Sequence, residues 1–163
     1  MFCFKLQFVI IKNIDINNKN FFIMNYIHLY NNLVELTRNK DLYQDFDKQD
    51  EFSDRLVFFL VHLAFFFKAF KNKENSTTLQ KIYDFIFRQL ELSIREIGYG
   101  DQSINKKMKD YLNLFHGLID KIHFWEEKEL KEKIEIFDIF MDKPKNKDFL
   151  VEYFDKYFDK LKN

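Results

Sequence analysis

The feature that most constrains the fold of this chain is its shortage of turn-forming residues. The 163 residues include three glycines and one proline. An all-β protein needs many tight turns, and most of these depend on glycine or proline. Long helices joined by a few polar segments need neither. The composition therefore argues against an all-β fold, and the length suits one domain with a single hydrophobic core.

The apolar residues repeat with the spacing of helix faces. This spacing begins at Tyr26 and recurs in residues 79–97 and 104–122. In the first of these two ranges we expect one inward face, made of Leu79, Ile82, Ile86, Leu90 and Ile97. The longest apolar run, residues 56–67, predicts a central helix that is buried on all sides. At about 12 residues it is shorter than the ~20 that cross a bilayer. We therefore expect an all-α fold, a single-domain bundle of about five to seven helices around a central apolar helix.

Charge and motif content exclude several classes of function. Acidic and basic residues number 26 each, so no net charge draws the chain to DNA or to an anionic membrane. The single cysteine, Cys3, excludes an internal disulfide and a cysteine-based zinc site. The sequence contains no glycine-rich phosphate loop, no His-Glu-x-x-His motif and no serine nucleophile elbow. We expect no enzyme, no cofactor, no metal and no specific DNA partner.

Three histidines were candidates for chemistry by their positions. His116 and His123 are two helical turns apart, but no second set of ligands accompanies them, so we interpret them as ordinary boundary residues. His62 interrupts the apolar run. There we expect a core histidine that is hydrogen-bonded to a backbone group or a carboxylate.

The chain divides into three segments by composition. Residues 1–23 combine a short aromatic run with an asparagine-rich stretch, and we interpret them as a non-core N-terminal extension. One explanation is an over-called start, with translation beginning at Met24, since the marks of a signal peptide are lacking. Residues 24–141 form the predicted helical domain. Residues 142–163 combine a charged linker containing Pro144 with an amphipathic C-terminal helix.

The C-terminal helix carries a stripe of aromatic and aliphatic side chains. Two interpretations stay open for it. The stripe packs back on its own domain, or it faces a partner or a membrane as an arm. Its members are Phe149, Leu150, Tyr153, Phe154, Tyr157, Phe158 and Leu161.

Two of the three glycines predict a sharp corner between helices. Gly98 follows residues 79–97 where a left-handed residue ends a helix, and Tyr99-Gly100-Asp101 completes the turn. A third glycine, Gly117, falls inside the next helix, where it lowers helix propensity by about 1 kcal/mol relative to alanine. We expect a neighbouring helix to approach closely there.

Charged residues flank this corner. Lys106, Lys107 and Lys109 lie in the first turns of the second helix, where the helix dipole disfavours cations. They are either a solvated face or a docking patch for an acidic surface or a phosphate backbone. Arg95 and Glu96 are either a structural pair that anchors the corner or part of a partner site. Surface pairs contribute only about 0–1 kcal/mol, so stability alone explains little.

The same stretch resembles the signature of the ubiquinol–cytochrome c chaperone family. That family has the pattern Leu-Arg-Glu-x-Gly-x-Gly-Asp, then a Lys-Lys-Met-Lys helix and a Phe-Tyr-Gly triplet, with Asp-Gly-Arg-Phe and Leu-His-Leu elements upstream. The matching residues here are Ile94-Arg95-Glu96-Ile97-Gly98-Tyr99-Gly100-Asp101, Lys106-Lys107-Met108-Lys109, Phe115-His116-Gly117, Asp54-Arg55-Leu56 and Leu60-Val61-His62-Leu63. The resemblance covers roughly residues 30–125. It departs at Ser53-Asp54-Arg55, which lacks the usual glycine, and at Leu118, where arginine is common.

The resemblance implies a non-catalytic assembly chaperone for cytochrome b and the cytochrome bc1 complex. Mitochondrial members of the family work with a small helical partner, bind newly made cytochrome b near the ribosomal exit and hold it for haem insertion. By the same resemblance we expect a location in the bacterial cytoplasm at the inner membrane, or in the mitochondrial matrix of a eukaryote. The alternative is a membrane-peripheral helical adaptor that uses the C-terminal stripe.

The resemblance also suggests which residues contact a partner. They gather at the corner, in the following turns and at the start of the central helix. These residues are Arg95, Glu96, Gly98, Tyr99, Gly100, Asp101, Lys106, Lys107, Lys109, Asp54 and Arg55.

Overall fold

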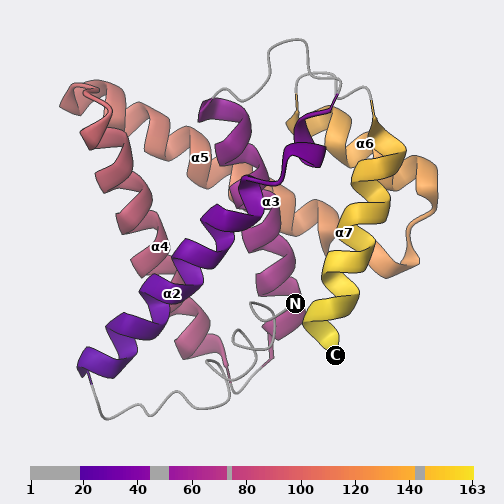
Figure 1. Ribbon diagram of the computed structural model, residues 1–163, viewed down its shortest axis with the longest axis horizontal. Helices are drawn as coiled ribbons and strands as arrows, with labels where there is room; N and C mark the ends of the chain where they lie inside the picture. The colour runs from indigo at the N-terminus through magenta and orange to yellow at the C-terminus, as the bar shows by residue number, and fades with distance from the viewer. Residues whose placement is uncertain (1–18, 45–51, 73–74, 142–145) are drawn as a thin grey trace.

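The computed structural model describes residues 19–44, 52–72, 75–141 and 146–163, with side chains described from Tyr26 onward. These segments contain helices and turns but no strand, so the all-α prediction is confirmed (Figure 1). The α-helices are α2 (Lys19–Thr37), α3 (Phe52–Phe70), α4 (Ser76–Glu96), α5 (Asp101–Ile122), α6 (Leu130–Phe140) and α7 (Lys147–Lys162). Two short 3-10 helices, η1 (Lys40–Tyr43) and η2 (Trp125–Glu127), lie between them.

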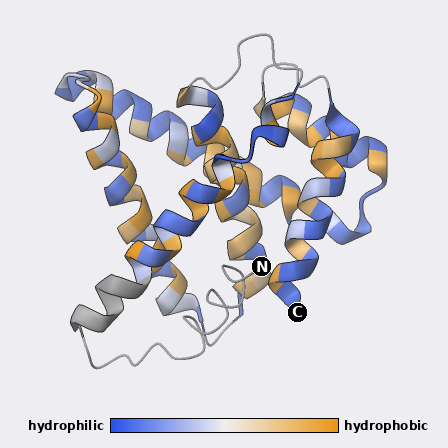
Figure 2. Cartoon of the chain, viewed as in Figure 1, coloured by the Kyte–Doolittle hydropathy of each residue, from blue (hydrophilic) through white to orange (hydrophobic). Residues whose placement is uncertain are grey.

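Helix α3 is the centre of the bundle. It packs against α2, α5 and α7, and each residue from Phe58 to Phe66 is buried. Apolar side chains dominate its surface, whereas α4 and α5 alternate between apolar and polar faces (Figure 2). The predicted central apolar helix is therefore confirmed. The helix begins at Phe52, so Ser53 and Asp54 lie inside its first turn.

Helices α4 and α5 form a hairpin whose inner faces follow the predicted spacing. Of the residues expected to face inward, most are buried or packed against the core, and Ile97 is the exception. Ile97 is 53% exposed because α4 ends at Glu96, and Ile94, one turn earlier, takes the inward position instead. The position at which α4 ends therefore explains why Ile94 is buried in the core and Ile97 is exposed.

Helix α7 packs on α3 and α6. Leu150, Phe154, Tyr157, Phe158 and Leu161 are buried there, and Phe149 and Tyr153 are partly buried against the core. The interpretation that the C-terminal stripe packs back on its own domain is therefore confirmed. The stripe is not an exposed arm in this structure. The linker at Pro144 lies outside the described residues.

The predicted N-terminal boundary stays a prediction. We expected the first helix of the domain from Tyr26, but α2 begins at Lys19 and therefore runs through Met24 without a break. The remainder of the proposed extension, residues 1–18, lies outside the described residues.

His62 links the central helix to α7. The residue is fully buried, and burial lowers its pKa to about 4. Its Nδ1 lies 2.6 Å from the Phe58 carbonyl oxygen, which only accepts, so Nδ1 carries the proton. Its Nε2 therefore accepts a hydrogen bond of 2.9 Å from the Tyr153 hydroxyl. The predicted core histidine with a hydrogen bond to a backbone group is confirmed, and its second partner is a tyrosine hydroxyl.

A second buried polar group lies next to this contact. Trp125 of η2 packs edge-on against Phe65, with 4.9 Å between ring centroids. Its indole Nε1 donates a 2.6 Å hydrogen bond to Oδ1 of Asp155, which also pairs with Lys133 at 2.8 Å. We call His62, Phe65, Trp125, Phe137 and Phe154 the aromatic junction, since these buried rings join α3 to η2, α6 and α7.

The predicted close approach at Gly117 is also present. A Cβ atom at this position would lie 3.3 Å from Cε1 of Phe140 in α6. The neighbour is therefore an aromatic side chain, and α5 and α6 contact each other through it.

Candidate functional site

The corner between α4 and α5 has the conformation expected of its glycines. Gly98 has φ +96°, a backbone region that favours glycine, and its N–H donates to the Arg95 carbonyl at 2.9 Å. Gly100 is extended and serves as the N-cap of α5, where its carbonyl accepts from the Ile104 N–H at 3.0 Å. The chain thereby reverses direction between the two helices.

Arg95 connects the two helices across this corner. Its Nη2 and Nε atoms donate to Oε1 of Glu91 at 2.8 and 3.1 Å, and its Nη1 donates to Oδ1 of Asp101 at 2.5 Å. These hydrogen bonds, first those to Glu91 and then that to Asp101, raise the pKa of Arg95. The expected anchor is present, but its partners are Glu91 and Asp101 instead of Glu96. Glu96 is exposed.

The three lysines after the corner differ in their surroundings. The Lys107 ammonium lies 4.5 Å from the centroid of the Tyr99 ring, a cation–π distance. Lys106 and Lys109 are exposed and have no ion pair in the part of the chain that the structure describes. A contact within the corner therefore explains the position of Lys107, whereas Lys106 and Lys109 project into solvent.

The tip of the corner exposes apolar surface. Ile97 is 53% and Tyr99 is 40% exposed, and both lie between the charged residues of the two helices. Buried interface cores combine apolar and aromatic side chains with a charged rim. The corner has both parts, and the structure brings together the predicted residues from Arg95 to Asp101 with Lys107.

Asp54 and Arg55 occupy a separate place at the start of α3. Arg55 borders a small cavity of about 170 Å³ together with Leu90 and Ser93 of α4. This cavity lies beside the last turns of α4, one turn before the corner. The structure thus places Arg55 beside the last turns of α4, near the corner.

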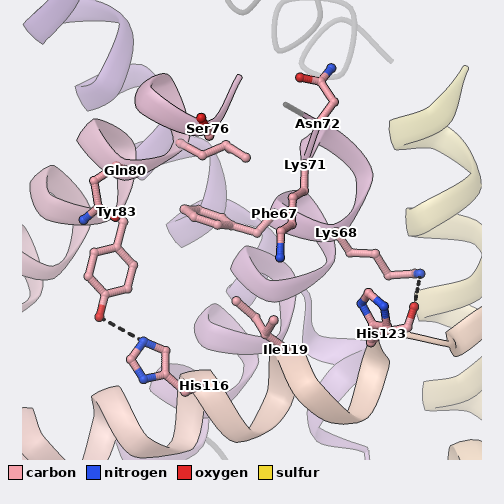
Figure 3. Close-up of a pocket in the computed structure, with 11 residues that line it drawn as sticks. Phe67, Lys68, Lys71, Asn72, Ser76, Gln80, Tyr83, His116, Ile119 and His123 are labelled. Carbon is pink, nitrogen blue, oxygen red and sulfur yellow. Dashed lines mark hydrogen bonds between the residues drawn. The ribbon is translucent and has the colours of Figure 1, made fainter. Parts of the chain in front are cut away.

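A larger cleft opens between α3, α4 and α5, with a volume of about 930 Å³ (Figure 3). Apolar side chains of Phe67, Leu79 and Ile119 form much of its surface. The other residues that border it are Lys68, Lys71, Asn72, Ser76, Gln80, Tyr83, His116 and His123. A cleft of this size falls in the range of small-molecule sites, roughly 300–1,000 Å³.

Two hydrogen-bonded bridges join the walls of this cleft. The Tyr83 hydroxyl of α4 lies 3.2 Å from Nε2 of His116 in α5, and the two rings are stacked with their planes at 7°. On the other side, Lys68 of α3 donates to the His123 carbonyl at the end of α5 at 2.6 Å. Figure 3 shows the two bridges on opposite sides of Phe67 and Ile119.

The charge around the cleft is one-sided. Among the described residues, its border contains two lysines and two histidines, and no aspartate or glutamate. Lys68 is already engaged, because it also pairs with Glu126 at 2.7 Å. Lys71 has no ion pair or side-chain hydrogen bond within the described residues, and its ammonium points toward the middle of the cleft (Figure 3). The cleft therefore presents one unengaged cation above an apolar surface.

The cleft was not predicted from the sequence. The two-turn spacing of His116 and His123 does put both on the cleft, which is the one sequence signal that pointed to it. In the sequence, that spacing suggests a metal site at most, and without further ligands it indicates ordinary boundary residues. Among the described residues, no three or more His, Cys, Asp or Glu side chains are placed to hold a metal ion. Tyr83 and Lys71 stand in no motif.

No helix of the described segments has both the length and the apolar character needed to cross a bilayer.

Comparison with known families gives one match. The model of the family described as ubiquinol-cytochrome C chaperone matches residues 44–123, just under half of the chain. The resemblance seen in the sequence is thereby confirmed. A search of curated proteins and a search of solved structures each gave no match.

Proposed function

We propose that this chain is a non-catalytic assembly chaperone for the cytochrome bc1 complex, because residues 44–123 match the model of the ubiquinol-cytochrome C chaperone family. Its client in this proposal is newly made cytochrome b. A small helical co-chaperone and the ribosome are the further partners. The proposed location is the cytoplasmic face of the bacterial inner membrane, or the matrix side in a mitochondrion.

The observation that carries this proposal is where the family match falls. Residues 44–123 include α3, α4 and α5, and these helices, with the residues that directly follow α3 and α5, provide the corner and the described border of the large cleft. Helices α6 and α7 lie after the matched segment and pack on it. The part of the chain shared with the family is thus the part with exposed, chemically distinctive surface.

The corner is the proposed docking surface for a protein partner. Ile97 and Tyr99 supply exposed apolar area, while Lys106 and Lys109 supply cations without ion pairs in the described segments. Burying an aromatic side chain at the centre of an interface contributes most of the binding energy, and the rim charges set orientation and the association rate. Lysines on this rim favour a partner with an acidic surface.

The test is a gene deletion with complementation in the organism that carries this gene. We expect the deletion to lower the amount of assembled bc1 complex on native gels and the b-type haem absorbance of the membranes. The wild-type gene should restore both. Normal levels of complex and haem in the deletion strain would rule out the proposal.

Charge reversal then tests the corner itself. The variant K106E/K109E should fail to restore assembly and should co-purify less cytochrome b than the tagged wild type. The matched control is Lys121→Glu, an exposed lysine near the other end of α5. If both variants restore assembly equally, the corner is not the docking surface, although the assembly function itself stands.

A further inference from the structure

We propose that the cleft between α3, α4 and α5 binds a single-chain anionic amphiphile, a long-chain fatty acid, with the carboxylate on Lys71 and the alkyl chain on the apolar surface. This inference goes beyond the assembly function and does not depend on it. Three observations support it: the charge of the border, the shape of the cleft and the state of Lys71.

The border selects for an anion. The described residues that border the cleft include two lysines and two histidines, and Glu126, which pairs with Lys68, is not among them. An anionic headgroup therefore meets no like charge among these described residues. A neutral or cationic headgroup would leave the Lys71 ammonium without a counter-charge.

The surface below Lys71 suits an alkyl chain. Phe67, Leu79 and Ile119 present ring and aliphatic carbon atoms to the cleft. Figure 3 shows Phe67 and Ile119 between the two bridges, with the Lys71 side chain reaching down toward them. A buried CH₂ group contributes about 0.8 kcal/mol, so even part of an alkyl chain placed here would drive binding.

The bridges favour a compact ligand over a protein segment. An α-helix with its side chains is about 10–12 Å wide and needs a groove that is open along its length. Here the Tyr83–His116 hydrogen bond joins α4 to α5, and the Lys68–His123 hydrogen bond joins α3 to α5. A helix that crossed both positions would have to break both contacts, whereas a single flexible chain fits between them.

Lys71 is the group in the cleft that is free to pair with a ligand. Lys68 has two partners, and the Nε2 atom of His116 is held by Tyr83. Within the described residues, Lys71 has neither a hydrogen bond nor an ion pair through its side chain. A charge-assisted bond between its ammonium and a carboxylate would be gained on binding without losing an existing contact.

The experiment is a fluorescence titration of the purified full chain with 11-(dansylamino)undecanoic acid, followed by displacement with palmitate. We expect saturable binding, displacement by palmitate and weaker displacement by hexadecanol, which has the same chain and no charge. Lys71→Met keeps the aliphatic stem and removes the charge. It should weaken palmitate binding roughly fivefold and leave hexadecanol unchanged.

The matched control is Lys121→Met, an exposed lysine of α5 that does not border the cleft and should bind palmitate as the wild type does. Circular dichroism confirms that each variant is folded. Equal palmitate affinity of the wild type and Lys71→Met would overturn the proposal, and so would a lack of saturable binding. Because the measurement uses no client protein, a negative result would not argue against the assembly function. An assembly defect, in turn, would not count as evidence for fatty-acid binding.

Discussion

The aromatic junction lies where α3 meets η2, α6 and α7, and the corner lies where α4 meets α5, on the side of the molecule away from α6 and α7 (Figure 1). Both contain hydrogen-bonded polar groups, but their settings differ. His62 and Trp125 are buried and hold their partners among packed rings, whereas Arg95 and Asp101 make their ion pair in solvent. Buried rings and satisfied buried polar groups stabilise a fold strongly, and exposed ion pairs do so weakly. The junction thus stabilises the fold. The ion pairs of the corner contribute little stability, so the same charged side chains are able to pair with those of a partner.

The largest expected effect breaks the junction. Trp125→Ala removes a side chain that is 1% exposed, together with its hydrogen bond to Asp155. We expect the free energy of unfolding to fall by about 3–5 kcal/mol, measured by urea denaturation. The neighbouring Phe124 is 55% exposed, so Phe124→Ala should change it by less than about 0.5 kcal/mol. Similar losses in the two variants would contradict the role assigned to the junction.

The next effect is a pH dependence that only the junction should show. The pKa of His62 is about 4 in the folded protein, below the ordinary value of about 6.5 in the unfolded chain. Below pH 6.5 the unfolded chain binds a proton that the folded protein does not. His62 therefore contributes stability that is complete above pH 6.5 and is lost as the pH falls toward 4, about 3 kcal/mol in total.

Two variants separate this contribution from that of the carboxylates. Urea denaturation between pH 7.5 and 4.5 should show a flatter decline for His62→Gln than for the wild type. His28→Gln, at an exposed position, should keep the wild-type slope. An unchanged slope in His62→Gln would mean that folding does not lower the pKa of His62.

A smaller effect concerns the backbone of the corner. Gly98→Ala forces a Cβ atom into a φ of +96°, although no atom lies within 4 Å of it. We expect a loss of about 1–2 kcal/mol from backbone strain alone. Gly100→Ala is the matched control, since its φ of −70° suits any residue, and it should change stability by less than about 0.5 kcal/mol. Thermal denaturation of the two variants measures the difference.

The smallest expected effect on stability is that of Arg95→Ala. The Arg95 side chain is exposed, and its ion pairs to Glu91 and Asp101 are screened by solvent. We expect a smaller drop in melting temperature than for Gly98→Ala, and none at 1 M NaCl, where surface ion pairs are screened. Cytochrome b recovered with the tagged variant should nevertheless fall. A stable variant with full client recovery would assign Arg95 to the turn alone.

Much of the fold could be predicted because helix faces and helix ends leave local marks. The apolar run around Leu60 predicted the buried central helix, and Gly98 predicted the corner. The error at Ile97 has a local cause. The spacing continues one residue beyond the point where α4 ends, and a periodic pattern alone does not locate that point.

The contacts between distant segments were less accessible to prediction. That His62 is a core histidine follows from its apolar neighbours, but its partner Tyr153 is 91 residues away. Likewise, Glu96 is next to Arg95 in sequence, but on a helix adjacent residues point in different directions, whereas Glu91 lies one turn away on the same side. The cleft could be predicted only from the relative positions of three helices. The sequence around Lys71 and Tyr83 therefore gives no indication that they border a cleft.

The hydrogen bond between His62 and Tyr153 has a consequence for the synthesis of this protein. Helix α3 leaves the ribosome long before α7, which covers one side of it. At translation rates of about 5–20 residues per second, the 91 residues between these partners correspond to roughly 5–20 s. During that interval the side of α3 that packs against α7 has no partner helix. A protein proposed to shelter an unfinished apolar client therefore passes through a comparable stage itself.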